Sequence, residues 1–449
     1  MPRLPAFFGS EEQQYGPFIA AAIFFGLVVG FPLGTTLAHA AAQGSNLGGR
    51  WPALAQVHGH LQLLGWVGLF VVGMGYRLVP RFTAVKVRPA MLVPLTLALI
   101  ALGLALRAIA QPFADEGAPA VVWVASAALE ALGAALFAGS VLRCLLLGRR
   151  DEFLYTPFFA SGAVWLALAL ALNLVFVADA AADGRLALPP PQSSAVVSAT
   201  MYGFALMFVL GVSLRTFPIF FERPPAPRRP ALAVWGLANA GLAVYVAALV
   251  WQSYDHSADL RLLNTGAYLA TGAALVVLVG LLRIFEGRPH RLRAAARRSM
   301  VFVRWAYGWL LLAAGLQVFF AARALVDERL PTHYETDAVR HFLAVGFLTM
   351  MMVGMALLVM PRLAMRRAVA GAGRTVALVL LVLINAAAAA RGAAALLENE
   401  MKIETGFWTS SVAGVLAILA GAVFAAHLLR TPPQPEIPLA AGAVEGDEQ

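Results

Sequence analysis

The sequence predicts an all-α, polytopic membrane protein whose twelve transmembrane helices form three four-helix repeats. The first observation is composition: 60% of the 449 residues are hydrophobic, 13% are charged, and the mean hydropathy is +0.76. These values lie outside the range of soluble globular proteins. The second is a series of apolar stretches, each of about 20 residues or more and so long enough to cross a bilayer. The third is a segment that occurs three times.

Hydropathy and the breaks at proline, glycine and charged residues place the spans, with boundaries good to a few residues. The twelve predicted spans are residues 16–40, 56–79, 89–110, 119–147, 154–178, 195–218, 231–251, 262–285, 299–325, 338–361, 374–397 and 407–429. The segment before the first span, MPRLPAFFGSEEQQYG, is too polar for a secretory leader. We therefore expect the first span to remain in the mature protein.

The repeated segment falls on spans 2, 6 and 10. It reads VHGHLQLLGWVGLFVVGMGYRLVPRF at 57–82, SATMYGFALMFVLGVSLRTFPIFF at 198–221 and HFLAVGFLTMMMVGMALLVMPRLA at 341–364. The three copies align without gaps at two glycines and one proline: Gly65, Gly203 and Gly346; Gly73, Gly211 and Gly354; Pro80, Pro218 and Pro361. An even number of spans per repeat keeps all copies in one orientation. The predicted units are residues 1–148, 149–290 and 291–430, followed by a disordered cytoplasmic tail at 431–449.

The net charge of +9 is better explained by membrane topology than by a nucleic-acid partner. Most arginines lie in short loops that follow even-numbered spans. The loop after span 8 carries Arg283, Arg288, Arg291, Arg293, Arg297 and Arg298. By the positive-inside rule these loops and both termini are cytoplasmic, in a bacterial inner membrane. Cys144 is the only cysteine, so neither an intramolecular disulfide nor a thiolate metal cage is possible.

Two histidines at matched positions are the strongest chemical signal. His60 and His341 each lie twenty residues before the repeated proline, near the outer end of an inward-running span. Ionisable side chains at this depth are costly and mark functional candidates. Two neutral imidazoles from opposed helices can hold a haem iron at both axial positions. We predict that His60 and His341 are haem ligands; the alternative is that each only hydrogen-bonds a neighbouring helix.

His58 and Arg340 extend this candidate site. His58 lies two residues from His60, about 200° around a helix, so the two side chains project to opposite sides. One histidine would then serve the site shared with span 10. The other would face a different pocket, where it could bind a second haem, bind a copper ion or hydrogen-bond a loop. The repeat register favours His60 for the shared site. Arg340 could pair with a haem propionate or be an ordinary interfacial arginine.

Other polar and glycine positions within the spans allow two interpretations. Gly65 and Gly73 are eight residues apart and lie on nearly one helix face, which permits close approach of a helix or of a flat macrocycle. Tight helix packing explains them by itself. Glu130, Asn173 and Gln317 are isolated polar residues that could belong to a hydrogen-bond or proton path.

The segments HGHLQLLGWVGLFVVGMGYRLVPRF and RHFLAVGFLTMMMVGMALLVMPRL resemble the NnrS family, membrane haem and copper proteins tied to nitric oxide metabolism. The twelve-helix plan is also similar to subunit I of haem-copper oxidases and nitric oxide reductases, which implies low-spin haem ligation by His60 and His341. The histidines that hold the second metal in those enzymes are missing: span 6 has none, and position 339, where a further haem ligand is expected, is Val339. No binuclear centre is visible.

The resemblance implies an integral membrane b-type haem protein, with one haem or two and copper as an option. Its expected partners are nitric oxide or another diatomic gas, and a quinol or cytochrome as electron donor; whether it is an enzyme stays open. A divergent oxidase or nitric oxide reductase would need metal ligands from elsewhere, such as His39, His256 or His333. A cofactor-free transporter with twelve helices is the remaining alternative.

Overall fold

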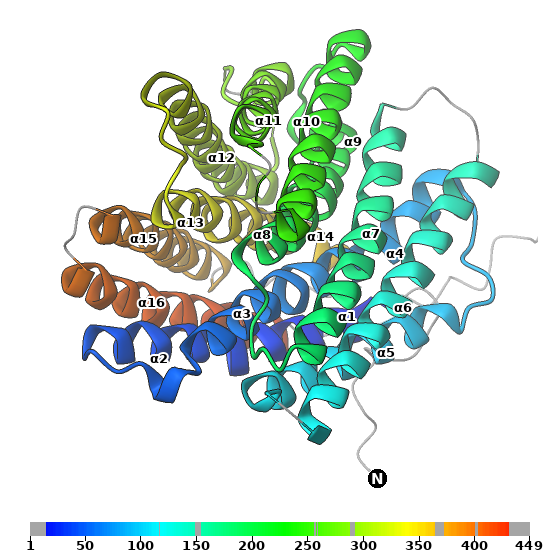
Figure 1. Cartoon of the computed structure of the whole chain (residues 1–449). Coiled ribbons are helices and arrows are strands. Elements are labelled where there is room, and N and C mark those ends of the chain that lie inside the picture. The colour runs from blue at the N-terminus through cyan, green and yellow to red at the C-terminus, as the bar shows by residue number, and fades with distance from the viewer. Residues whose placement is uncertain are drawn as a thin grey trace, which may run out of the picture.

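The computed structural model describes residues 15–115, 117–148, 154–255, 257, 259–287, 292–363, 372–399 and 403–430. Within these residues every regular element is helical, and twelve helices are long and apolar enough to cross a membrane. The predicted all-α fold is therefore confirmed, and the chain is a multi-pass membrane protein (Figure 1). His256 and the predicted tail at 431–449 lie outside the described residues.

Several spans consist of consecutive helical segments. The first four spans comprise α1 (Gly16–Ile23), η3 (Phe24–Gly30) and α2 (Phe31–Ala42); α3 (Trp51–His60), η5 (Leu61–Gly68) and α4 (Leu69–Thr83); α5 (Leu92–Ala110) and η6 (Gln111–Phe113); and α6 (Gly117–Leu147). The next four comprise α7 (Tyr155–Ala182); α8 (Pro190–Ser198), η7 (Ala199–Leu206) and α9 (Met207–Phe221); α10 (Arg228–Tyr254); and α11 (Arg261–Leu282). The last four comprise α12 (Ala294–Asp327); α13 (His333–His341), η8 (Phe342–Thr349) and α14 (Met350–Leu363); α15 (Ala372–Asn399); and α16 (Ile403–Arg430).

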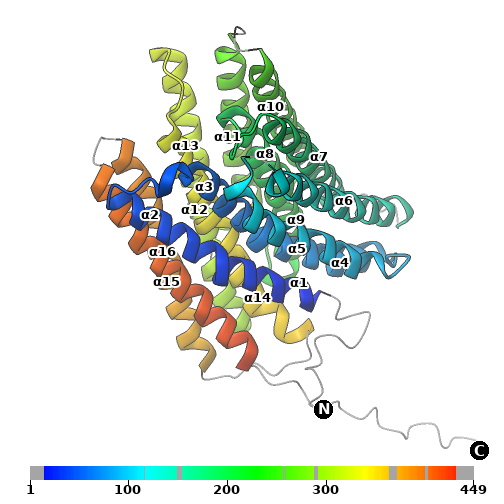
Figure 2. The same cartoon turned by 60° about the horizontal axis from the view of Figure 1, so that its bottom comes forward.

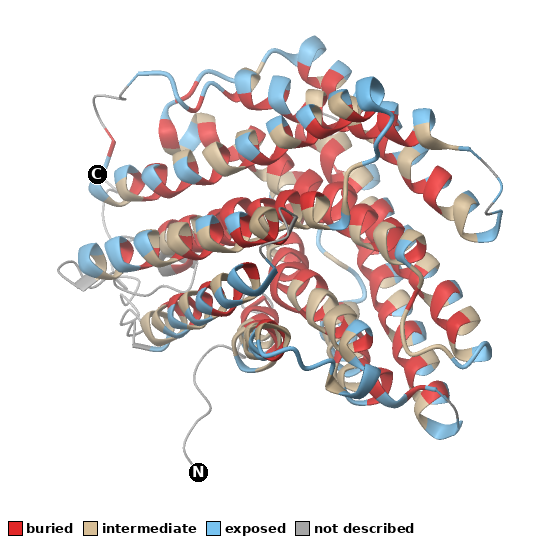
Figure 3. Ribbon diagram, turned by 60° about the vertical axis from the view of Figure 1, so that its left-hand side comes forward, coloured by how far each residue is buried: buried red, intermediate tan, exposed pale blue. Residues whose placement is uncertain are grey.

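The three spans that carry the repeated segment form the centre of the molecule. In the most apolar part of spans 2, 6 and 10, 78%, 83% and 72% of the residues are buried, against 28 to 56% in the other nine described spans. Segments η5, η7 and η8 contact one another, and Figure 3 shows helices that are buried along most of their length inside a more exposed outer layer. The outer layer alternates buried and exposed residues, as expected for helices that face lipid on one side.

Each central span contains a π-helical segment at the same repeat position. These segments begin directly after His60, Ser198 and His341. A π-helical turn holds an extra residue, so it rotates the side chains before it relative to those after it. The turn that carries each histidine is therefore offset from the rest of its span.

The repeated glycines allow close packing of aromatic side chains from the preceding span. A Cβ added at Gly65 would lie 2.9 Å from Phe25 Cβ, and one at Gly346 would lie 2.6 Å from Trp309 Cγ, both shorter than real contacts. The matched pairs are Gly65 with Phe25, Gly203 with Trp165 and Gly346 with Trp309. The structure thus supports helix packing, not approach of a macrocycle, as the role of these glycines.

The outer helices close a ring around the centre. The last helix of each predicted four-helix unit packs on the first helix of the next: α6 on α7, α11 on α12, and α16 on α2 (Figure 1). The last contact joins the third repeat to the first. It is at this junction, beside the N-terminal ends of spans 2 and 10, that His58 and His341 lie. We call the end of the bundle at which α3, α8 and α13 begin the histidine end.

Candidate functional site

His58 is held by the first span. Its Nδ1–H donates to the backbone oxygen of Gly30 at 2.9 Å. The ring also fits against Gly34, where an added Cβ would lie 2.6 Å from Nδ1 and 2.8 Å from Nε2. A carbonyl oxygen accepts only, so Nδ1 must carry the proton. This tautomer leaves the lone pair of Nε2 for a metal.

His341 is held by its own helix and by α15. Its Nδ1–H donates to the backbone oxygen of Asp337 at 2.9 Å, and the same nitrogen lies 3.2 Å from Asp337 Oδ1. Asp337 Oδ2 accepts from Arg391 Nη2 at 2.6 Å. A carboxylate in this position orients a ligating imidazole and increases its basicity. Here too Nε2 is the nitrogen left for a metal.

His58 and His341 are close enough to interact electrostatically. His58 interacts electrostatically with His341, Asp337 and Arg391, the residues that surround His341. Among the described residues, Arg391 Nη1 and Gln62 Nε2 are buried without a hydrogen-bond partner. Buried donors of this kind normally have an acceptor. They are suited to the carboxylates of a bound group.

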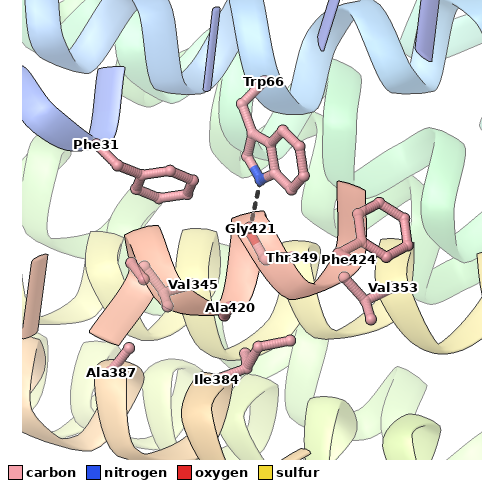
Figure 4. Close-up of a pocket in the computed structure, with 11 residues that line it drawn as sticks. Phe31, Trp66, Val345, Thr349, Val353, Ile384, Ala387, Ala420, Gly421 and Phe424 are labelled. Atoms are coloured by element: carbon pink, nitrogen blue, oxygen red, sulfur yellow. Dashed lines mark hydrogen bonds between the residues drawn. The ribbon is translucent and has the colours of Figure 1, made fainter. Parts of the chain in front are cut away.

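An apolar pocket lies between the same spans and spans 1, 11 and 12, lined by residues further along spans 2 and 10 than the histidines (Figure 4). Span 2 contributes Trp66 to its lining, and span 10 contributes Val345, Thr349 and Val353 at intervals of four residues. Spans 11 and 12 contribute the small residues Ala387, Ala417, Ala420 and Gly421. Trp66 Nε1 donates to Thr349 Oγ1 at 3.0 Å, bridging spans 2 and 10.

The donor set and the lining fit a haem, but the free space is small. The pocket encloses about 10 Å³, enough for about one water molecule. Figure 4 shows that the rings of Phe31, Trp66 and Phe424 surround this space. A macrocycle does not fit in this space as it stands. At the polar end of the site, His58 and His341 would be the residues to hold the iron of such a group, because each engages Nδ1 and leaves Nε2.

His60 lies on the other side of span 2, so the prediction that His58 and His60 project to opposite sides is confirmed. His60 Nε2 lies 2.8 Å from Glu130 Oε2 on α6, and its other electrostatic neighbour is Arg107. The contacts of His60 are thus with the first four-helix unit, and His341 is not among its neighbours in the structure. His58 takes the position beside His341.

Two of the three isolated polar residues named from the sequence, Glu130 and Asn173, lie beside the buried Arg107. The third, Gln317, lies elsewhere: its Oε1 accepts from Tyr202 OH and its amide donates to the backbone oxygen of Tyr268. Arg107 Nη1 donates to Asn173 Oδ1 at 3.0 Å, and its Nε donates to Gln111 Oε1 at 2.9 Å. Gln111 Nε2 donates to Gln56 Oε1 at 3.2 Å. The Gln56 amide in turn donates to the backbone oxygen of Leu188, in the loop before α8, and accepts from its backbone nitrogen. The network reaches from the loop at the histidine end to the interior of the first repeat.

Arg340 faces away from the candidate haem site. Its Nη2 donates to Ser194 Oγ on α8 at 3.1 Å, and its electrostatic neighbours are Tyr202, Tyr245 and Tyr268. Adjacent residues on a helix point about 100° apart, which explains why His341 and Arg340 serve different surroundings. Arg391 replaces Arg340 as the arginine beside His341.

The remaining histidines are scattered. His39 is exposed and contacts the ring of Trp408, while His333 is exposed beside Tyr334. In the part of the chain that the structure describes, no group of three His, Cys, Asp or Glu side chains is placed to hold a metal ion. These histidines therefore do not gather into a second site there.

Sequence reasoning missed three residues of the site: Gly34, Asp337 and Arg391. Asp337 had a readable signal, since it precedes His341 by four residues and so lies on the same helix face. Gly34 and Arg391 had none, because their roles depend on how spans 1 and 11 pack against spans 2 and 10.

Comparison with known proteins agrees with this architecture. The family model described as NnrS protein matches residues 17–432. A haem-copper terminal oxidase, solved as a dimer by cryo-electron microscopy, superposes with a TM-score of 0.69 at 12% sequence identity, covering 94% of this chain and 84% of that chain. A search of curated proteins found no match. The structural likeness extends over the whole bundle and concerns the fold.

Proposed function

Because this chain belongs to the NnrS family, we propose that it is an integral membrane b-type haem protein of the bacterial inner membrane, acting in nitric oxide handling or electron transfer. The observation that carries the proposal is the pair of imidazoles from two central helices, His58 and His341. In each, Nδ1–H is engaged by an acceptor and Nε2 is left for a metal. A histidine with only a structural role would not require a second histidine nearby that is protonated on the same ring nitrogen.

The residues around the pair have distinct tasks. The backbone oxygen of Gly30 and the carboxylate of Asp337 hold the two rings in fixed orientations. Arg391 and Gln62 offer donors to carboxylates, and the apolar lining excludes water from the centre of the site. A bound haem supplies a redox-active iron. Two nitrogen ligands on rigid helices favour electron transfer, whereas binding of nitric oxide or another diatomic gas requires one imidazole to move away.

The charge distribution supports an orientation with the histidine end outside. The arginine-rich loops follow even-numbered spans and so lie at the opposite end of the bundle, which the positive-inside rule assigns to the cytoplasm together with both termini. A quinol from the bilayer or a cytochrome outside the membrane could then deliver electrons near the site.

The test is to purify the protein from cells with an ample haem supply and measure haem content and reduced-minus-oxidised absorption spectra. The proposal predicts one b-type, low-spin haem per chain. Titration of the reduced protein with nitric oxide then separates the two roles: a spectral change supports gas handling, and an unchanged spectrum supports electron transfer. A colourless protein would overturn the haem assignment.

A further inference from the structure

A second cavity lies at the histidine end, between α10, α11, α12 and the start of α13. Figure 2 shows α10, α11 and α13 together at this end of the bundle. The cavity encloses about 110 Å³. Its polar lining consists of Tyr245, Gln252, Asn264, Thr265, Tyr268 and Thr336. An engineered protein cavity of about 150 Å³ takes up benzene, so this space is close to the size of one aromatic ring.

Two lining residues have unsatisfied polar atoms. Asn264 and Thr265 are only 7% and 3% exposed. Among the described residues, Asn264 Oδ1 and Thr265 Oγ1 have no hydrogen-bond partner. A buried unpaired polar atom costs about 1 to 3 kcal/mol, so it calls for an explanation. An acceptor oxygen in a cavity of this size is suited to a ligand that donates a hydrogen bond.

The other features of the cavity indicate a neutral aromatic ligand. The rings of Tyr245 and Tyr268 lie 5.5 Å apart at an interplanar angle of 31°, which forms an aromatic wall. None of the described residues that line the cavity carries a charge. Arg340 acts on Tyr245 and Tyr268 from outside the lining, so a charged ligand would lose its hydration without a charged group in direct contact, at high cost.

The cavity is close to the candidate haem site. Thr336 lines it, while Asp337 and His341 lie on the adjacent face of the same helix, α13. A helix with its side chains is about 10 to 12 Å across. A ring bound in the cavity is thus separated from His341 by one helix.

We propose that this cavity binds the ring of a hydroquinone headgroup, with a hydroxyl donating to Asn264 Oδ1 and the ring packed on Tyr245 and Tyr268. The assignment of this cavity as an electron-donor site rests on the electron-transfer role proposed above. The binding itself does not require haem. The two proposals can therefore fail separately.

The test uses benzene-1,4-diol as the probe, without oxygen, and ligand-observed NMR titration of the purified full-length protein in detergent. The wild type should bind the diol saturably and at least about tenfold more tightly than benzene, because only the diol donates to Asn264. Asn264→Leu should weaken diol binding about tenfold. It should leave the Tm equal or higher, since an unsatisfied buried oxygen is replaced by an apolar group of similar size. Ala321→Leu, which fills the cavity, should abolish binding.

The matched control is Asn239→Leu on α10. Asn239 Oδ1 accepts from Trp165 Nε1 at 2.9 Å, and its amide donates to the backbone oxygen of Trp235 at 2.8 Å. This variant should have a lower Tm and unchanged diol binding. Equal binding of diol and benzene, no saturable diol binding by the wild type, or unchanged binding by Asn264→Leu would each overturn the proposal. The double variant His58→Ala, His341→Ala should still bind the diol; loss of binding there would place the ring at the haem site instead.

Discussion

Gly34→Ala tests the position of His58 by adding a single methyl group. The added Cβ would lie 2.6 Å from Nδ1 and 2.8 Å from Nε2 of His58. Ordinary contacts begin near 3.4 Å, so the imidazole must move by about 1 Å. A shift of that size breaks the 2.9 Å hydrogen bond to Gly30. It also exceeds the roughly 0.5 Å within which a ligand must be placed.

We therefore expect Gly34→Ala to convert a low-spin haem spectrum into a high-spin one, or to abolish haem binding. Alanine is favoured over glycine within a helix, so the backbone should not be destabilised. The matched control is Gly59→Ala, one residue from His58, where an added Cβ meets nothing within 4 Å. The assay is the absorption and electron paramagnetic resonance spectrum of each purified variant. An unchanged low-spin spectrum in Gly34→Ala would refute the placement of His58 at this site.

Two further variants address the surroundings of the histidines. Asp337→Asn removes the negative charge beside His341 and should raise the haem midpoint potential by on the order of 60 mV, which is a tenfold change in the one-electron reduction equilibrium. An unchanged potential in redox titration would argue against Asp337 as the group that orients His341. Glu130→Leu leaves Arg107 buried without its carboxylate neighbour and should lower the free energy of unfolding by about 3 to 5 kcal/mol. Glu130→Gln, which keeps a hydrogen bond to His60, should cost less in thermal unfolding, and neither change should alter the haem spectrum.

The fold was predictable because its signal is local. A stretch of about 20 apolar residues must be helical and must span the membrane, since no other structure satisfies its backbone there. The repeated glycines and prolines located the central helices for a similar reason: Gly65 and its two counterparts recur wherever a central span packs on an aromatic side chain. The π-helical segments had no such signal, because they depend on packing between helices.

The choice between His58 and His60 was not predictable from repeat register. Repeats related by rotation meet through heterologous contacts, in which one position of a repeat faces a different position of the next. Under the predicted repeat arrangement, equivalent residues such as His60 and His341 would point in rotated directions and would not face each other. His60 turns toward Glu130 within its own repeat, and His58 turns toward the third repeat. The rotation between repeats had to be known to make this choice.

The most direct measurement is the reduced-minus-oxidised spectrum of three single variants, His58→Ala, His60→Ala and His341→Ala, compared with the wild type. Ligation by His58 and His341 predicts that the low-spin spectrum is lost in His58→Ala and His341→Ala and kept in His60→Ala. Loss of the spectrum in His60→Ala with retention in His58→Ala would contradict the account.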